Sequence, residues 1–293
     1  MSFNNYSPFC VVLVFVYSVI ICKESKQMNN HNVPQSTLSP WLIDVKKATI
    51  SKKAGQFITN DTSGSPVVID WQITDILSSD IAAFKQNVCD LAAEVTATIE
   101  TQFLRAHPEA VSQGGFLQTC EPLFAHGIEN VDWQAVEKTI QTSIKQFYLM
   151  DISKFGTDII NKLADDIYLF ASIKDQKTDK LLGFIMSSIT PALPYGDIKV
   201  ISVITAPEEQ NRELEKILLS SVLMVIPQVK RMFTITRPTN SATIDAYKAC
   251  GFTQDLNPVQ DPNHTISMEH LVIFEYKTEQ SDILQKTAAT LIG

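Results

Sequence analysis

The sequence predicts a mixed α/β fold, in which helices pack on one sheet within a single domain. Helical spacing of apolar residues dominates residues 81–147. Apolar and β-branched runs of strand length then fill residues 165–205, and strand and helix patterns alternate from there towards the end of the chain. An order of helices first, then a strand meander, then strand–helix–strand–helix–strand is typical of a mixed sheet.

Composition excludes several classes of protein. The 293 residues are 45% hydrophobic, which is enough to bury a full core, and the formal net charge is −8. This charge argues against a general nucleic-acid binder, whose affinity depends on neutralising phosphates. No C-x-x-C, Walker loop, G-x-S-x-G or H-E-x-x-H occurs, and His107, His126 and His270 lack metal-ligand spacing. We therefore expect no metal site and no nucleic-acid partner.

The first 27 residues form a separate apolar N-terminal segment. Residues 9–22 (FCVVLVFVYSVIIC) are uncharged, but as a helix they would span only about 21 Å of a hydrocarbon core about 30 Å thick. Three interpretations stay open: a short membrane anchor, a signal peptide, or a true start at Met28 that leaves residues 1–27 untranslated. If the segment inserts, the lysines after it predict a cytoplasmic main domain tethered to the membrane. Residues 28–65 are polar and predict a linker or a loosely packed extension.

The main domain is predicted to span residues 66–293. It opens with a strand, PVVIDWQI, and Ser78 or Ser79 could cap the helix that follows. The remaining predicted elements are a helix from Trp133, strands over 165–175, 180–190 and 198–205, a helix over 212–225, a strand over 232–237, a helix over 241–249, a strand over 269–277 and a helix over 281–291.

Two stretches carry chemistry as well as pattern. In the first, VISVITAPEEQNRELEKILLSSVL, a buried strand runs through Pro207 into a helix. Such a junction presents free backbone N–H groups and the positive end of a helix dipole, which suits a pyrophosphate. In the second, a strand ends at Asn240 and a short helix places Tyr247 two turns on. Gly251-Phe252 then ends the helix, and we expect a left-handed cap at Gly251.

Both stretches, in this order, resemble the acetyl-CoA site of the GNAT family of N-acetyltransferases. The family pattern Q/R-x-x-G-x-G/A corresponds to residues 210–215, and the later pattern, Asn, seven residues to Tyr, then four to Gly-Phe, is met from Asn240 to Phe252. The Pro66–Ala82 stretch is similar to the family's first strand and helix. The resemblance covers about residues 66–280 and implies a GNAT-like fold with acetyl-CoA as cosubstrate.

The resemblance also implies roles for individual residues. The backbone groups of Val203, Ile204 and Thr205 would pair with the acyl and pantetheine amides. Asn240 would hold the cofactor arm, and the Tyr247 hydroxyl would protonate the departing thiolate. The pyrophosphate would be cradled by the amides of Gln210, Asn211, Arg212, Glu213, Leu214 and Glu215.

The loop departs from the family pattern at both glycines, which are replaced by Glu213 and Glu215. Glycine there lets the backbone approach the phosphates, whereas each carboxylate adds repulsion of about 1 kcal/mol at ~4–5 Å in water-like surroundings. Arg212, Arg231 or Arg237 could compensate. Alternatively, glutamates in the first turn of a helix stabilise it by ~0.3–1 kcal/mol without any ligand.

The sequence is compatible with two functions, which belong to different classes of protein. The first is an N-acyltransferase that moves an acetyl group from acetyl-CoA to a primary amine by direct attack, with a small-molecule or protein amine as acceptor. Asp197 is a candidate general base, although an aspartate in an exposed turn is the plainer interpretation. The second is a catalytically inactive GNAT-like binding or scaffold protein that has lost the pyrophosphate loop, and membrane contact through residues 9–22 could tether it. Glu213 and Glu215 favour the second, and Asn240 with Tyr247 favours the first.

Overall fold

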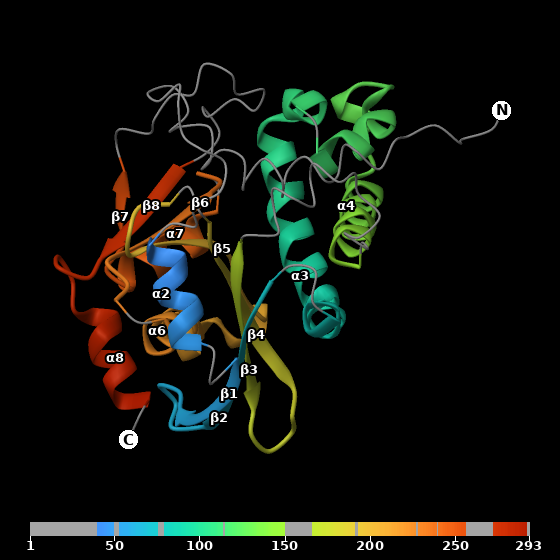
Figure 1. The fold of residues 1–293 in the computed structure, drawn as a ribbon. Coiled ribbons are helices and arrows are strands. Elements are labelled where there is room, and N and C mark those ends of the chain that lie inside the picture. Colours follow the sequence, from blue (N-terminus) through green and yellow to red (C-terminus); the bar gives the residue numbers. More distant parts are fainter. Residues whose placement is uncertain are drawn as a thin grey trace, which may run out of the picture.

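An eight-stranded sheet organises the chain in the order β1-β2-β3-β4-β5-β6-β8-β7 (Figure 1). The computed structural model describes residues 40–49, 53–75, 79–113, 115–149, 166–190, 193–226, 228–238, 240–255 and 272–291. Neighbouring strands are antiparallel except for β5 and β6, which are parallel. A parallel pair requires a crossover, which a helix provides between these two strands. The predicted mixed α/β sheet is confirmed.

The strands are β1 (Ala54–Asn60), β2 (Pro66–Thr74), β3 (Ile167–Asp175), β4 (Leu181–Ile189), β5 (Asp197–Thr205), β6 (Arg231–Thr236), β7 (Thr253–Asp255) and β8 (Val272–Lys277). The α-helices are α2 (Pro40–Thr49), α3 (Ser79–Ala106), α4 (Trp133–Tyr148), α6 (Leu214–Val225), α7 (Ser241–Ala249) and α8 (Ile283–Leu291). The 3₁₀ helices are η2 (Pro108–Gln113), η3 (Gly115–Phe124), η4 (Ile128–Asn130) and η6 (Pro207–Arg212).

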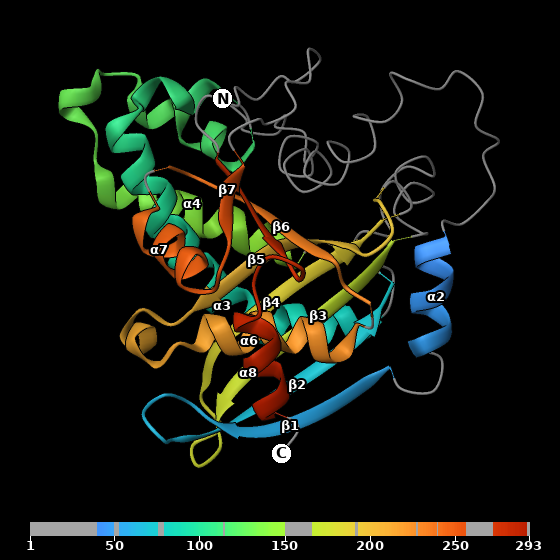
Figure 2. The same cartoon turned by 90° about the vertical axis from the view of Figure 1, so that its left-hand side faces the viewer.

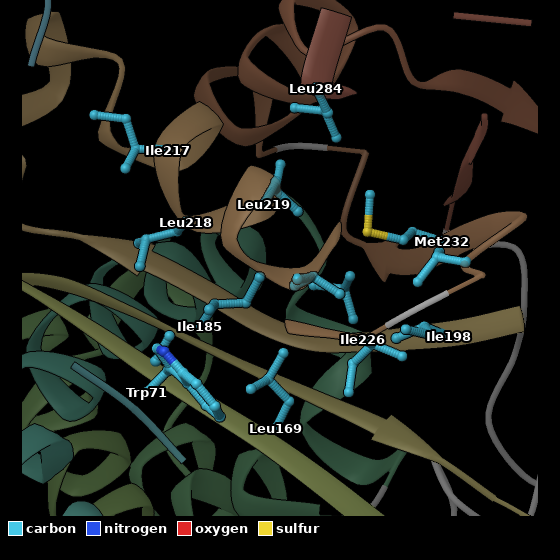
Figure 3. Close-up of a cluster of buried hydrophobic side chains, with 14 of the residues drawn as sticks. Trp71, Leu169, Ile185, Ile198, Ile217, Leu218, Leu219, Ile226, Met232 and Leu284 are labelled. Carbon is cyan, nitrogen blue, oxygen red and sulfur yellow. The ribbon is translucent and has the colours of Figure 1, made fainter. Parts of the chain in front are cut away.

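Each face of the sheet has its own hydrophobic core. One core joins the sheet to α2, α6, α7 and α8, and the other joins the opposite face to α3, α4 and the 3₁₀ helices before α4 (Figures 1 and 2). Figure 3 shows Leu218 and Leu219 of α6 and Leu284 of α8 above the strand residues Trp71 and Ile185. Burial of such side chains contributes ~1.5–3 kcal/mol each, which fixes α6 and the loop before it against the sheet.

Two elements lie inside the range that the sequence predicted to be a linker. The helix α2 buries Trp41, Leu42 and Val45 in the first core, and β1 pairs with β2 along its whole length. Residues 40–49 and 54–60 are therefore part of the folded domain. The strand β7 and the 3₁₀ helices were also not predicted. Predicted elements from β2 to α8 are confirmed, with boundaries that differ by a few residues.

The apolar segment 9–22, the possible start at Met28 and the polar residues up to 39 lie outside the described residues. Within the part of the chain that the structure describes, no helix is both long and apolar enough to span a membrane.

Candidate functional site

The strands β5 and β6 pair at one end and separate at the other. Their parallel register joins Asp197–Lys199 to Arg231–Phe233 and stops there, although β5 continues to Thr205. On its other edge, β5 stays paired to β4 as far as Thr205. Because peptide groups of a strand alternate between its two edges, every second residue beyond Lys199 presents its amide to the gap between β5 and β6. Val203, Ile204 and Thr205, predicted to pair with a ligand's amides, lie along this separated half.

The end of β5 is held tightly against β4. A Cβ on Gly183 would lie 2.7 Å from the carbonyl oxygen of Ile204, so the close approach of the two strands requires glycine at this position. The backbone N–H of Ala206 also donates to Leu182 O at 2.8 Å. The strand edge that faces the gap is thus a rigid one.

The loop after β5 has a left-handed residue at the first glycine position of the family pattern, but that residue is not glycine. Residues Pro207–Arg212 form η6, and Glu213 then takes the left-handed conformation, with φ 52° and ψ 33°, before α6 starts at Leu214. Glu213 is the position where the family pattern has its first glycine, and a left-handed non-glycine residue costs about 1–2 kcal/mol. The helix predicted to start at Arg212 therefore begins two residues later, at the left-handed residue.

The second glutamate of the loop turns towards β5. The hydroxyl of Thr205 donates a short hydrogen bond to Glu215 Oε1, which joins the last residue of β5 to the first turn of α6. Lys216 Nζ lies 3.3 Å from Glu213 Oε2. A carboxylate of the chain itself therefore occupies the interval between the strand end and the helix N-terminus, where the helix dipole stabilises it.

Arg212, the nearest candidate to compensate the glutamates, is engaged elsewhere. Its Nε donates to Asp61 Oδ2, and its Nη1 donates to Glu209 Oε2 at 2.7 Å. The Asp61 side chain is fully buried in the turn between β1 and β2, where it also accepts hydrogen bonds from Ser63 and from the Ser65 backbone. Burial by itself would raise the pKa of Asp61, but these hydrogen bonds and the Arg212 charge together lower it.

The other two candidate arginines are paired as well. Arg231 donates from Nη2 to Asp197 Oδ2 at 2.6 Å, across the register pair that joins β5 to β6. Arg237 lies 3.3 Å from Glu100 on α3, with its guanidinium 4.0 Å above the ring of Phe103. None of the three arginines suggested by the sequence thus presents an unpaired charge to the loop.

Asp197 is neither an exposed turn residue nor an available base. Its side chain is buried, and Arg231 holds the carboxylate through two hydrogen bonds, from Nε at 3.1 Å and from Nη2 at 2.6 Å. Eight residues of extended strand, about 26 Å, separate it from Thr205 at the loop end of β5. The sequence-based proposal of Asp197 as general base finds no support in this geometry.

Asn240 lies at the N-terminus of α7, as its pattern predicted. Its side-chain oxygen accepts from the Thr243 backbone N–H at 3.3 Å, and its Nδ2 donates to Thr236 Oγ1 at 3.4 Å. The cap links α7 to the end of β6, which is the strand that separates from β5. At the other end of α7, Gly251 has φ 86°, the left-handed conformation expected after a helix.

Tyr247 reaches from α7 to the separated half of β6. Its side chain is only 3% exposed, and its hydroxyl lies 3.3 Å from Thr234 Oγ1, one residue beyond the last position of β6 that pairs with β5. Burial raises the pKa of Tyr247 to about 12; Cys250 and Glu215 add smaller contributions, and the hydrogen bond with Thr234 acts in the opposite direction. The phenol is therefore protonated at neutral pH and can donate but not accept a proton.

A second tyrosine, on the other face of β5, was not singled out from the sequence. Tyr148 ends α4 and hydrogen-bonds to the Ser202 side chain, and burial raises its pKa to about 12. Met186 pairs with Ser202 and Ser187 pairs with Val200, so β5 has a bulge next to Ser202. This bulge turns the Ser202 side chain towards α4, and the sequence shows no sign of it.

Metal chemistry has no candidate among the described residues, because they contain no group of three or more His, Cys, Asp or Glu side chains placed to hold an ion. Gln210 and Asn211, whose amides were predicted to bind the pyrophosphate, both belong to η6. Their side chains lie outside what the structure describes. The site therefore consists of a strand edge, a loop with two carboxylates, and a buried phenol.

Comparison with known proteins gives one match to a family model. Residues 129–252 match the model of the acetyltransferase (GNAT) family, a range that contains α4, β3 to β6, α6, α7 and the entire loop. The match covers less than half of the chain, and over these residues it confirms the GNAT resemblance predicted from the sequence. Among curated proteins, none matches the sequence of this chain.

Solved structures with similar folds include N-acetyltransferases. The PaiA N-acetyltransferase of Thermoplasma acidophilum in complex with coenzyme A is 15% identical, with a TM-score of 0.38 over 71% of this chain and 98% of the other. The GNAT domain of S. lividans PAT is 13% identical, with a TM-score of 0.37 over 76% and 96%. A variant of the spermidine N-acetyltransferase SpeG from Vibrio cholerae is 17% identical, with a TM-score of 0.30 over 41% and 70%. TM-scores this low say nothing about the substrate of this chain.

Proposed function

We propose that this protein is an N-acyltransferase that takes an acetyl group from a pantetheine thioester, acetyl-CoA in the family's usual chemistry, and transfers it to a primary amine. The observation that carries the proposal is the separation of β5 from β6 with the Tyr247 hydroxyl at its side. A free strand edge pairs with an extended amide-bearing arm in the same way that it pairs with another strand.

The donor supplies an activated acyl group whose carbonyl carbon is open to attack by an amine. The chain's own residues bind and orient it: amides of β5 between Val203 and Thr205 pair with the arm, and Asn240 keeps α7 in place against β6. These groups position the reactants, which is where much of the rate of a direct transfer originates.

Tyr247 holds the proton that the leaving sulfur needs, at its Oη. A phenol of pKa about 12 donates to a thiolate of ordinary pKa ~8.5 against a difference of ~3–4 units. The transfer thus requires that the site also raise the pKa of the sulfur, which burial does. The enclosed position of Tyr247 supports this requirement.

The acceptor is proposed to be a small-molecule or protein amine, and the net charge of −8 is compatible with a cationic one. We also propose that the domain lies in the cytoplasm, with membrane contact through residues 9–22. These residues lie outside the part of the chain that the structure describes.

A second candidate is a catalytically inactive GNAT-fold protein used for binding. The specific observation in its favour is the loop, where Glu215 lies beside Thr205 and Arg212 is paired with Asp61 and Glu209. In this alternative, the internal pairs replace the ligand's phosphates and keep the fold rigid.

Calorimetric titration of acetyl-CoA and free CoA into the full chain, followed by an amine screen monitored through thiol release, separates the two. Binding with release of thiol in the presence of an amine supports the transferase. Absence of both binding and thiol release at millimolar donor would leave only the binding protein.

A further inference from the structure

We infer that the donor site recognises the pantetheine arm and disfavours the pyrophosphate of CoA, so that its matching donor is a pantetheine thioester that carries no nucleotide. The inference rests on the proposed function, because it presupposes a thioester donor. It assigns Glu213 and Glu215 a role in donor specificity.

The first observation is the charge around the loop. Among the described residues, the ion pairs and the hydrogen bond of the loop join five carboxylates and three cations, which together carry a net charge of −2. The carboxylates are Asp61, Glu208, Glu209, Glu213 and Glu215, and the cations are Lys180, Arg212 and Lys216. A pyrophosphate adds at least two further negative charges to a surface that already repels it.

The second observation is that each of these cations is already paired. Lys180 Nζ lies 2.8 Å from Glu208 Oε1, and Lys216 Nζ lies 3.3 Å from Glu213 Oε2. Arg212 contacts two carboxylates through Nε and Nη1, and its remaining amino group, Nη2, is buried without a hydrogen-bond partner in the part of the chain that the structure describes. A phosphate that approached Arg212 would therefore meet the carboxylates of Asp61 and Glu209 beside it.

The third observation is the position of Glu215. Its carboxylate accepts a hydrogen bond from the Thr205 hydroxyl, so it joins the end of β5 to the first turn of α6. In addition, Glu213 adds a side chain at the left-handed residue that precedes α6. Both glutamates therefore stand where phosphate oxygens would need to approach the backbone.

The rest of the site has different chemistry. The separated edges of β5 and β6 present peptide groups without charge, and the hydroxyls of Thr234 and Tyr247 are neutral as well. A pantetheine arm is itself neutral and carries two amides, which a strand edge can pair. The neutral strand edges thus suit the pantetheine half of CoA, whereas the acidic loop disfavours the pyrophosphate half.

Salt dependence gives the sharpest test with the unmodified full chain. We expect S-acetylpantetheine to bind at least as tightly as acetyl-CoA in calorimetry. Screening weakens repulsion between charges, so added salt should tighten acetyl-CoA binding and leave acetylpantetheine binding unchanged. A site that uses cations for the phosphates would show the opposite trend.

Neutralising substitutions provide the second arm. In the Glu213→Gln/Glu215→Gln variant, acetyl-CoA should bind roughly tenfold more tightly, whereas acetylpantetheine should change by less than about twofold. Glutamine keeps the size of each side chain and a hydrogen-bonding group for Thr205. Each single variant, Glu213→Gln or Glu215→Gln, is compared with Glu129→Gln on the exposed 3₁₀ helix η4, which also removes one negative charge.

The outcomes distinguish this inference from the proposed function. Acetyl-CoA binding about tenfold or more tightly than acetylpantetheine, with affinity falling as salt rises, would overturn the inference and leave the transferase standing. Failure of both donors to bind the unmodified chain and the glutamine variant, at any salt concentration, would overturn both.

Discussion

The loop after β5 and the stretch around α7 differ in how closely they follow the GNAT pattern. Around α7, Asn240 caps the helix, Tyr247 reaches β6 and Gly251 is left-handed, so both geometry and composition follow the pattern. In the loop, Glu213 adopts the glycine-like conformation but brings a charge with it. Backbone conformation and electrostatics can therefore differ within one site, and a glycine-like conformation at one residue does not by itself imply the ligand that a glycine would admit.

The largest effect is expected from removing Asp61, the buried partner of Arg212 in the loop. Asp61→Ala should destabilise the protein by about 3–5 kcal/mol, because it leaves the half-buried guanidinium of Arg212 with only Glu209 and removes the turn's acceptor. Denaturant unfolding measures this loss. The Asp61→Ala/Arg212→Leu double variant should recover part of it; simple additivity of the two single changes would mean that the pair is not coupled.

The same pair predicts a pH dependence. The pKa of Asp61 is lowered in the folded state, so its contribution to stability is complete above the ordinary value of ~3.9. The contribution disappears as the pH falls through the lowered folded pKa. The difference in unfolding free energy between the unmodified protein and Asp61→Ala should therefore shrink on acidification, and a difference that persists at low pH would contradict the ionic interpretation.

The stretch around α7 is tested through the hydroxyl of Tyr247. Tyr247→Phe should reduce turnover by about 100-fold or more while donor affinity stays nearly constant, because a general acid acts only in the transition state. Thiol release gives the rate, and calorimetry gives the affinity. Tyr276→Phe is the matched control, since its hydroxyl donates to the Ser281 carbonyl at 2.7 Å in the same core. An equal loss of rate in both variants would assign the effect to packing.

The smallest effect concerns the conformation of Glu213. Glu213→Gly should be more stable than Glu213→Ala by about 1 kcal/mol, because only glycine takes a left-handed conformation without cost. At Glu215, inside the first turn of α6, the order should reverse, with alanine the better by up to about 1 kcal/mol. Thermal unfolding of the four variants measures both signs, and the same order at both sites would contradict the backbone assignment.

Much of this fold could be predicted from local sequence. Strands with continuous apolar runs, such as β3 and β4, and the spacing from Asn240 to Phe252 are visible without any knowledge of neighbours. The edge strand β1 is not, because its inward positions are only Gly55, Phe57 and Thr59, and an exposed Ile58 interrupts the alternation. The short α2 has its three buried side chains inside a polar region, so its signal is weak.

The candidate site was predictable as a place but not as an electrostatic environment. The two glutamates at the glycine positions could be identified directly, whereas the partners of the arginines could not. Arg212 and Asp61 are 151 residues apart, and Arg237 and Glu100 are 137 apart. Such contacts depend on tertiary structure, and no spacing rule along the chain indicates them.

The turn between β1 and β2 has a consequence for the order in which the molecule assembles. Asp61 is synthesised long before Arg212, and contacts across such a separation in sequence form slowly because a large chain loop must close first. Until then, the arginine is available to any anion, and the turn is held by hydrogen bonds within residues 61–65. The electrostatic character of the loop is therefore acquired late in folding, when these two distant segments of the chain meet.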